Sequence, residues 1–223
     1  MLLSKIIYTI QELRSKFSQS DDNPLSDRQV LFILNYYRSF LIRQDMEKAR
    51  PLSPFIIQEL TLDLEKVDKV ISPMDPAFKS GDKILRTTIE IPKPIEGYMR
   101  DYLTYVGRAD FEDRWTQLDL QSLGSVSYTR HAGRFPRWFA RENHIYVKFP
   151  PTCTVKKILV RGVFEEPEIV AKLNKKIAPF TGMEWDYPIS NNMLSTIIKM
   201  LEESEFRFTF AIPKDHENDG SQQ

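Results

Sequence analysis

Residues 144–164 read HIYVKFPPTCTVKKILVRGVF, and this stretch decides what kind of fold the chain forms. In residues 144–149 the odd-numbered positions are apolar, which is the period of a half-buried strand. A second run rich in Ile, Leu and Val follows at residues 155–164, where Gly162 marks a candidate bulge. Because only a short proline-containing segment joins the two runs, we predict that they form a β-hairpin.

The sequence on the N-terminal side of this stretch also has a composition typical of β-strands. Prolines recur between short segments rich in Ile, Val, Thr, Tyr and Phe, which is typical of strands separated by turns. The further predicted strands cover residues 55–64, 84–91, 102–106, 125–128 and 138–140.

Helical patterns occupy both ends of the chain. Apolar residues recur at helical spacing over residues 3–17, and Ser26 and Gln29 form a capping box before a second helix at 27–48. Apolar side chains lie on more than one face of that second helix, so we expect it to be buried on several sides or to lie at an interface. Two more helices are predicted near the C-terminus, at 165–177 and about 190–201.

These elements predict an α+β fold, in which terminal helices form a small helical layer and the middle section is rich in β-structure. We expect residues 1–50 and 165–205 to form the helical core and residues 51–164 to form the β-rich unit. Alternating phenylalanines suggest that residues 206–223 are a C-terminal strand followed by a polar tail.

Composition excludes several classes of protein. The 31 Lys and Arg balance the 31 Asp and Glu, which argues against a free-standing nucleic-acid binder. The 41% of hydrophobic residues is too high for intrinsic disorder. A single cysteine, Cys153, rules out a disulfide within the chain, and we expect neither a signal peptide nor a transmembrane helix.

No pattern of catalytic or metal-binding residues is present. The three histidines lack partners at metal-ligand spacing, and neither a glycine-rich phosphate loop nor a Gly-x-Ser-x-Gly motif occurs. Acidic pairs such as Asp110 and Asp113 fit turns or solvated surface better than acid–base chemistry. We therefore expect no catalytic residue, cofactor or metal, and predict that the chain is not an enzyme.

The most unusual local feature is basic and aromatic. Residues 125–161 carry eight Lys and Arg against one Glu, a net charge of +7, with aromatic residues interleaved. Three interpretations stay open: a protein interface, a solvated face, and a surface that contacts phosphates and stacks bases. The interface candidates within it are Arg134, Arg137, Trp138 and Arg141.

The opposite charge is concentrated at the C-terminus. Residues 202–223 carry six acidic residues against two basic ones, a net charge of −4. Such separation favours head-to-tail packing of identical subunits, basic face against acidic face.

Several short segments occur in a fixed order along the chain. They are SDRQ at 26–29, NYYR at 35–38, LIRQ at 41–44, IPKPI at 91–95, YVGRAD at 105–110, KILVRGVFEEP at 157–167 and YPI at 187–189. In this order they resemble segments of virion structural proteins from crAss-like, short-tailed bacteriophages, and the resemblance covers roughly residues 26–205.

This resemblance implies an adaptor or ring protein of the head-to-tail connector, with no active site. Such a protein docks on the portal, meets further tail ring proteins, and forms a homo-oligomeric ring, a dodecamer in this family, around the DNA channel. Arg38 and Arg43 then become candidates for inter-subunit ion pairs, and non-specific contact with channel DNA is expected, without a membrane partner. The protein is expected in the virion after assembly in the host cytoplasm. The alternative is a nucleic-acid-binding module that uses residues 125–161.

Overall fold

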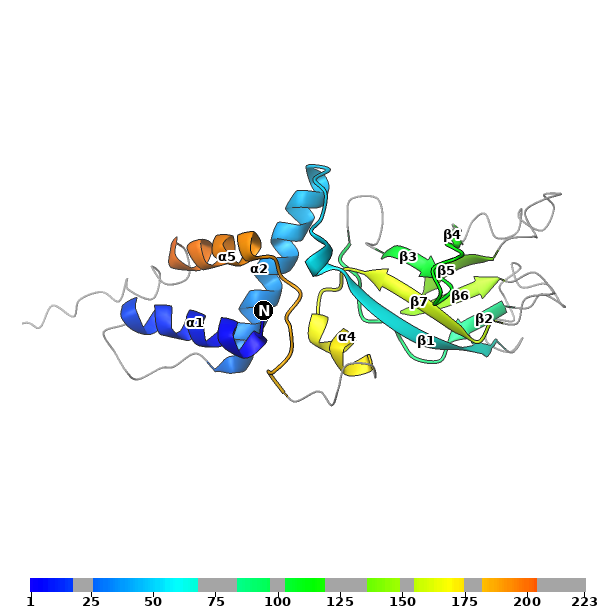
Figure 1. Ribbon diagram of the computed structural model, residues 1–223, viewed down its shortest axis with the longest axis horizontal. Helices are drawn as coiled ribbons and strands as arrows, with labels where there is room; N and C mark the ends of the chain where they lie inside the picture. The colour runs from blue at the N-terminus through cyan, green and yellow to red at the C-terminus, as the bar shows by residue number, and fades with distance from the viewer. Residues whose placement is uncertain are drawn as a thin grey trace, which may run out of the picture. The chain divides into compact units, whose positions relative to one another are not determined.

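The computed structural model describes residues 1–17, 26–67, 84–96, 103–118, 136–148, 155–174 and 182–203. The chain divides into two units (Figure 1). Residues Met1–Leu41 and Gly182–Gln223 belong to the helical unit, and residues Ile42–Thr181 belong to the β unit. The predicted α+β class, with helices from the chain ends and a β-rich middle, is confirmed.

The helical unit contains α1 (Leu3–Phe17), the first part of α2 (Asp27–Glu47) and α5 (Asn191–Glu203). The capping box before α2 forms as predicted, because the Ser26 N–H donates to Gln29 Oε1 at 2.9 Å while the Gln29 N–H donates to Ser26 Oγ at 3.4 Å. The reciprocal bonds satisfy backbone donors at the start of α2, which explains why the helix begins at Asp27.

Each of these helices buries one apolar stripe. The stripes consist of Ile6 and Ile10 in α1, Val30 and Leu34 in α2, and Leu194 and Ile197 in α5. The chain before α5 is tied to α1 by the Leu3 N–H, which donates to the carbonyl of Trp185 at 2.9 Å. Segments from both ends of the chain therefore build one compact unit.

The β unit contains a seven-stranded sheet with the strand order β3-β7-β1-β2-β6-β5-β4. All neighbouring strands are antiparallel except β4 and β5, which are parallel. A short 3₁₀ helix, η1 (Pro54–Ile56), precedes the first strand. The strands are β1 (Gln58–Lys66), β2 (Ile84–Thr87), β3 (Leu103–Gly107), β4 (Thr116–Gln117), β5 (Arg137–Arg141), β6 (His144–Lys148) and β7 (Lys157–Gly162).

The predicted hairpin between residues 144–149 and 155–164 is wrong, although both runs are strands. β6 pairs with β5 and β2, whereas β7 pairs with β1 and β3. The hairpin partner of β6 is β5, through a two-residue turn in which Glu142 and Asn143 have φ values of 51° and 59°. Positive φ at both central positions is typical of the turn whose twist matches that of the flanking strands.

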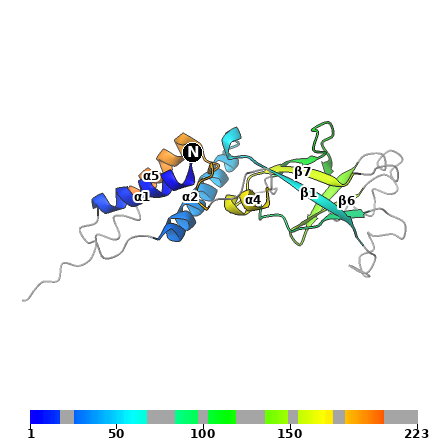
Figure 2. The ribbon, with the colours of Figure 1, turned by 60° about the horizontal axis from the view of Figure 1, so that its bottom comes forward.

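The two edges of the sheet are joined by one short segment. Arg114 bridges to Gly107 in β3, and the Trp115 N–H donates to the carbonyl of Val106 at 2.9 Å. The next two residues, Thr116 and Gln117, pair with β5 at the other edge. The sheet thus closes on itself, and its strands curve around a common interior (Figure 2).

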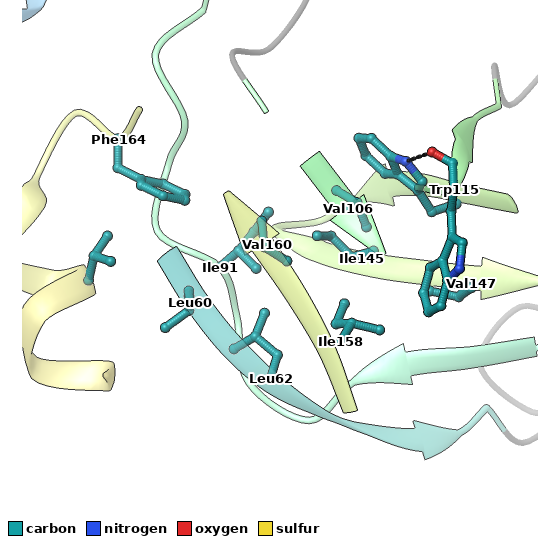
Figure 3. Close-up of a cluster of buried hydrophobic side chains, with 12 residues drawn as sticks. Leu60, Leu62, Ile91, Val106, Trp115, Ile145, Val147, Ile158, Val160 and Phe164 are labelled. Carbon is teal, nitrogen blue, oxygen red and sulfur yellow. Dashed lines mark hydrogen bonds between the residues drawn. The ribbon is translucent and has the colours of Figure 1, made fainter. Parts of the chain in front are cut away.

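Apolar side chains fill this interior (Figure 3). They come from alternate positions of the strands, as expected for one face of a pleated sheet. Leu60, Leu62, Val106, Trp115, Trp138, Ile145, Val147, Ile158 and Val160 are all buried members of this cluster.

Helix α4 (Pro167–Leu173) belongs to the β unit, although residues 165–205 were expected in the helical core. Its Val170 joins the same apolar cluster as Leu60 of β1, and Gln58 Nε2 donates to the carbonyl of Pro167 at 3.1 Å. The helix therefore packs on the sheet of its own unit. The predicted strand at 125–128 and the C-terminal strand and tail at 206–223 lie outside the described residues.

Candidate functional site

Arg38 is an interior residue of the helical unit. Its side chain is 0% exposed, and its Nε donates to the carbonyl of Pro188 at 2.9 Å. The guanidinium carbon lies 5.8 Å from the ring centroid of Tyr187, whose hydroxyl donates to Asn35 Oδ1 at 2.6 Å. Arg38 thus fastens the segment before α5 to α2, and its burial contradicts the inter-subunit ion pair expected at this residue.

Arg43 lies five residues further along α2 and is half-exposed. Its Nη2 atom lies 2.6 Å from Glu165 Oε1, so its ion pair in the isolated chain is internal to the β unit. The same carboxylate lies 3.5 Å from Lys93 Nζ, and its charge raises the pKa of Lys93 above the ordinary value. Contact between Arg43 and a neighbouring subunit stays a prediction.

Trp138 is a core residue rather than a surface one. Its side chain is only 4% exposed, and its indole N–H donates to the carbonyl of Trp115 at 3.2 Å, the dashed line in Figure 3. The next residue, Phe139, stacks on Tyr146 at 5.1 Å between ring centroids, and both rings are buried. None of these three aromatic rings is available to stack on a base.

The cations of β7 face acidic partners on β1. Arg161 Nε lies 3.0 Å from Glu59 Oε1, and Lys157 Nζ lies 3.5 Å from Asp63 Oδ1. These residues lie opposite each other in the β1–β7 register, on the face away from the apolar interior. The charge of β7 is therefore balanced across the sheet by an acidic strand that lies almost 100 residues earlier in the sequence.

A third pair extends this row of charges to β2. Arg86 Nη2 lies 2.5 Å from Glu65 Oε1 across the β1–β2 register, and the hydrogen bond to Glu65 raises the pKa of Arg86 above its ordinary value. We call the six residues Glu59, Asp63, Glu65, Arg86, Lys157 and Arg161 the charge ladder. Its net charge is zero, since three acids face three cations.

The remaining candidates of the basic segment lie at or near β5. Arg141 Nε lies 3.3 Å from Glu142 Oε1 at the β5–β6 turn, and Arg137 lies opposite Lys148 in the β5–β6 register. Arg134 lies outside the described residues. In the described part of residues 125–161 the aromatic rings are buried and the β7 cations face acidic partners, which argues against the nucleic-acid-binding alternative. Residues 125–135 and 149–154 lie outside the described residues, so the alternative stays a prediction.

A tight turn after β3 is built around Tyr105 and Gly107. The Tyr105 hydroxyl donates to the carbonyls of Arg108 and Asp113 at 2.9 and 3.0 Å. Burial, followed by the charge of Asp110, raises the pKa of this phenol above its ordinary value. A Cβ atom at Gly107 would meet the Asp113 carbonyl oxygen at 2.1 Å, so only glycine fits this position.

The outward face of α2 carries an exposed aromatic surface that local sequence patterns did not identify as a contact surface. Phe32, Tyr36 and Phe40 are large, exposed and spaced by four residues, so they form one stripe along the helix. We call these three residues the α2 aromatic stripe. The sequence carries the signal, because apolar residues lie on more than one face of this helix, but the pattern alone does not tell which face is covered.

The parts of the chain that the structure describes lack both a metal-binding cluster and a membrane-spanning helix. Those parts contain no group of three or more His, Cys, Asp or Glu arranged to hold a metal ion. None of the helices there has the length and hydropathy needed to cross a membrane.

Comparison with known proteins relates the chain to phage tail ring proteins. Residues 5–223 match the family model described as phage tail ring protein 2. Ring protein 2 of Bacteroides phage crAss001 is 25% identical over 238 residues, which cover 98% of this chain and 96% of that protein. Both the helical unit and the β unit fall within these matches.

Proposed function

The chain belongs to the phage tail ring protein 2 family, and on this basis we propose that it is the repeating subunit of a ring that joins the portal to the tail around the DNA channel. The family assignment confirms the resemblance to structural proteins of crAss-like phages, and it gives the chain a structural role in the tail ring of a virion. This is a class of structural protein and not of enzymes.

The match over residues 5–223 carries the proposal, because it includes both units of the chain rather than one. In the proposed assembly the ring is homo-oligomeric, with twelve copies, and it meets the portal on one side and further tail ring proteins on the other. Arg43, Arg137 and Arg141 are proposed as polar contacts at the rim of these interfaces, where charged residues are common. Assembly takes place in the host cytoplasm.

The charge ladder supports a passive role toward DNA. A channel lining has to let the phosphate backbone pass, and each unpaired cation that binds a phosphate adds to a salt-dependent affinity. In the charge ladder the three cations already face carboxylates, so this surface holds DNA weakly. Contact with channel DNA is then brief and independent of sequence.

Mass photometry of the purified chain, alone and mixed with the portal protein of the same phage, tests the ring. Twelve copies of the 26.2 kDa chain give a particle of about 314 kDa, and docking adds that mass to the portal particle. Negative-stain images of the mixture give the rotational symmetry. A chain that stays monomeric at all concentrations, with and without the portal, would contradict the proposed function.

A further inference from the structure

The α2 aromatic stripe is an apolar surface that the described part of the helical unit leaves open. Phe32, Tyr36 and Phe40 are 72%, 62% and 45% exposed. A rise of about 1.5 Å per residue spreads them over roughly 12 Å of one helix side. Tyr36 is also oriented by Tyr37, with the two rings edge to face at 5.5 Å between centroids. An ordered aromatic ring loses little side-chain freedom on binding, which favours a contact surface.

The stripe lies in a part of α2 without exposed charge. Between Gln29 and Ile42 the only charged residue is Arg38, which is fully buried on the opposite side. Phosphates need cations, and helices that bind anionic lipid surfaces carry Lys and Arg beside their apolar face. The chemistry of the stripe therefore fits an apolar protein surface and neither a nucleic acid nor a charged membrane.

The area of the stripe fits the centre of a protein interface. Three aromatic side chains of about 150–250 Å² each, exposed by roughly 60% on average, present on the order of 350 Å². This is the size of the largest apolar patches on monomeric proteins, which are often functional. It is also somewhat less than half of the roughly 800 Å² that each partner buries in a stable complex, so the stripe needs a surrounding rim.

A second copy of the chain is the occupant that the ring requires. Each subunit of a ring presents two different surfaces, one to each neighbour. Each cation of the charge ladder faces a carboxylate of its own chain, whereas the aromatic rings of the stripe stay exposed among the described residues of their unit. We propose that the α2 aromatic stripe is the buried centre of the contact between adjacent copies of this chain, an inference that rests on the proposed ring function.

The contact is head-to-tail, so the stripe of one copy meets a different surface of the next copy. If two stripes packed on each other, the interface would be self-complementary and growth would stop at a dimer. Arg28 and Gln29 precede the stripe on the same side of α2 and are exposed. They supply the polar rim that the small apolar area requires.

Replacement of the stripe by a polar helix former tests this contact. The triple variant F32Q/Y36Q/F40Q alters only exposed side chains, and Gln keeps helix propensity high. We expect the wild-type chain to form rings and the triple variant to remain monomeric at concentrations at least 100-fold above those at which the wild type assembles, with an unchanged circular dichroism spectrum. The matched control is Y8Q/F55Q, which removes two other exposed aromatic side chains and retains assembly.

The possible outcomes distinguish a failure of this inference from a failure of the proposed function. A wild-type chain that never associates overturns the ring and, with it, this contact. A wild type and a triple variant that assemble equally leave the ring in place and overturn the role of the stripe.

A photo-crosslinker at position 36 identifies the occupant directly. Benzoylphenylalanine replaces Tyr36 in a mixture of isotopically light and heavy chains, and mass spectrometry identifies the crosslinked peptides. We expect light–heavy crosslinks from position 36 to a surface outside α2. Crosslinks only within one copy, for example to residues 204–223, would show that the chain covers its own stripe and would overturn the proposal. Crosslinks only to the portal protein, or only between two stripes, would also overturn it.

Discussion

The charge ladder of the β unit and the α2 aromatic stripe of the helical unit both face outward, but they differ in what they leave open. Each cation of the ladder meets a carboxylate of the same chain within 3.5 Å. The stripe instead leaves a large part of three aromatic rings exposed. The comparison teaches that a residue's binding potential depends on whether its own chain already supplies a partner, and less on its type.

Arg38 gives the largest expected effect, because it is a fully buried charged residue of α2. R38A removes a buried side chain together with the hydrogen bond to the Pro188 carbonyl, and we expect it to lower the free energy of unfolding by about 3 kcal/mol. Urea denaturation measures the loss, and hydrogen–deuterium exchange should locate it in α2 and in the segment before α5.

The control for this variant is R43A. Arg43 is half-exposed and its ion pair is partly solvated, so its removal should cost less than about 1 kcal/mol. Equal losses for the two variants would contradict the difference in burial between them.

Gly107 tests the turn that joins the edges of the β sheet. G107A places a methyl group where the Asp113 carbonyl oxygen and the Tyr105 hydroxyl now lie, so the turn has to shift. We expect a loss of about 2 kcal/mol in the free energy of unfolding, measured by urea titration.

G182A is the matched glycine control. Gly182 has open space around its Cα but a φ of +59°, so alanine there should cost only about 1 kcal/mol of backbone strain. A G107A variant as stable as the wild type would mean that the turn relaxes without penalty.

Removal of the ladder acids should turn a balanced surface into a DNA-binding one. The variant E59Q/D63N/E65Q leaves Arg86, Lys157 and Arg161 without their carboxylates, a change of three charges. We expect affinity for a 30-base-pair duplex to rise by at least tenfold in 50 mM salt, with a salt dependence steeper by up to about 2.7 in log–log slope. Fluorescence anisotropy across a salt series measures both quantities.

The control removes the same charge elsewhere. E12Q/E202Q/E203Q changes three acidic residues of the helical unit and should leave DNA affinity within about twofold of the wild type, since it uncovers no row of cations. If both variants gain affinity equally, total charge rather than local pairing decides DNA binding.

The smallest effect concerns one pair within the ladder. E59R and R161E should each destabilise the chain slightly, and the double variant E59R/R161E should recover most of the loss. The coupling free energy in this double-mutant cycle should be about 0.5 kcal/mol, because both side chains are partly solvated. A coupling of zero would show that the register, and not the ion pair, sets their proximity.

Much of the secondary structure followed from local patterns. The capping box and the helical spacing of apolar residues predicted α1 and α2 almost to the residue, because both depend on neighbours within one turn of helix. The alternation in residues 144–149 likewise placed β6 correctly. The short β4 was missed, because a two-residue strand shows no period.

Local sequence patterns could not predict which strands pair with each other. Alternation tells which face of a strand is buried, but it does not tell which strand lies beside it. The proximity of β6 and β7 in the sequence suggested a hairpin, whereas the true partner β5 is joined through Glu142 and Asn143, a turn without the glycine that usually signals it.

The charge count along the chain could not choose among its three interpretations, for a related reason. A net charge of +7 over residues 125–161 is a sum along the chain, while electrostatic interaction depends on distance in space. Arg38 shows the opposite case, because a signal existed: it continues the four-residue spacing of Val30 and Leu34, which places it on the buried side of α2. Its charge favoured a surface position, but its spacing gave the correct one.

The closure of the β sheet affects how the chain behaves before the virion assembles. A sheet with an open edge offers unpaired backbone groups to any other copy, and a virion protein accumulates in many copies before its partners are complete. Because the segment from Arg114 to Gln117 pairs with both β3 and β5, the described strands offer little backbone for such edge-to-edge growth into fibres. The chain can therefore reach a high concentration without pairing through its sheet edges. Its first contacts with other copies are then made by side chains rather than by backbone groups.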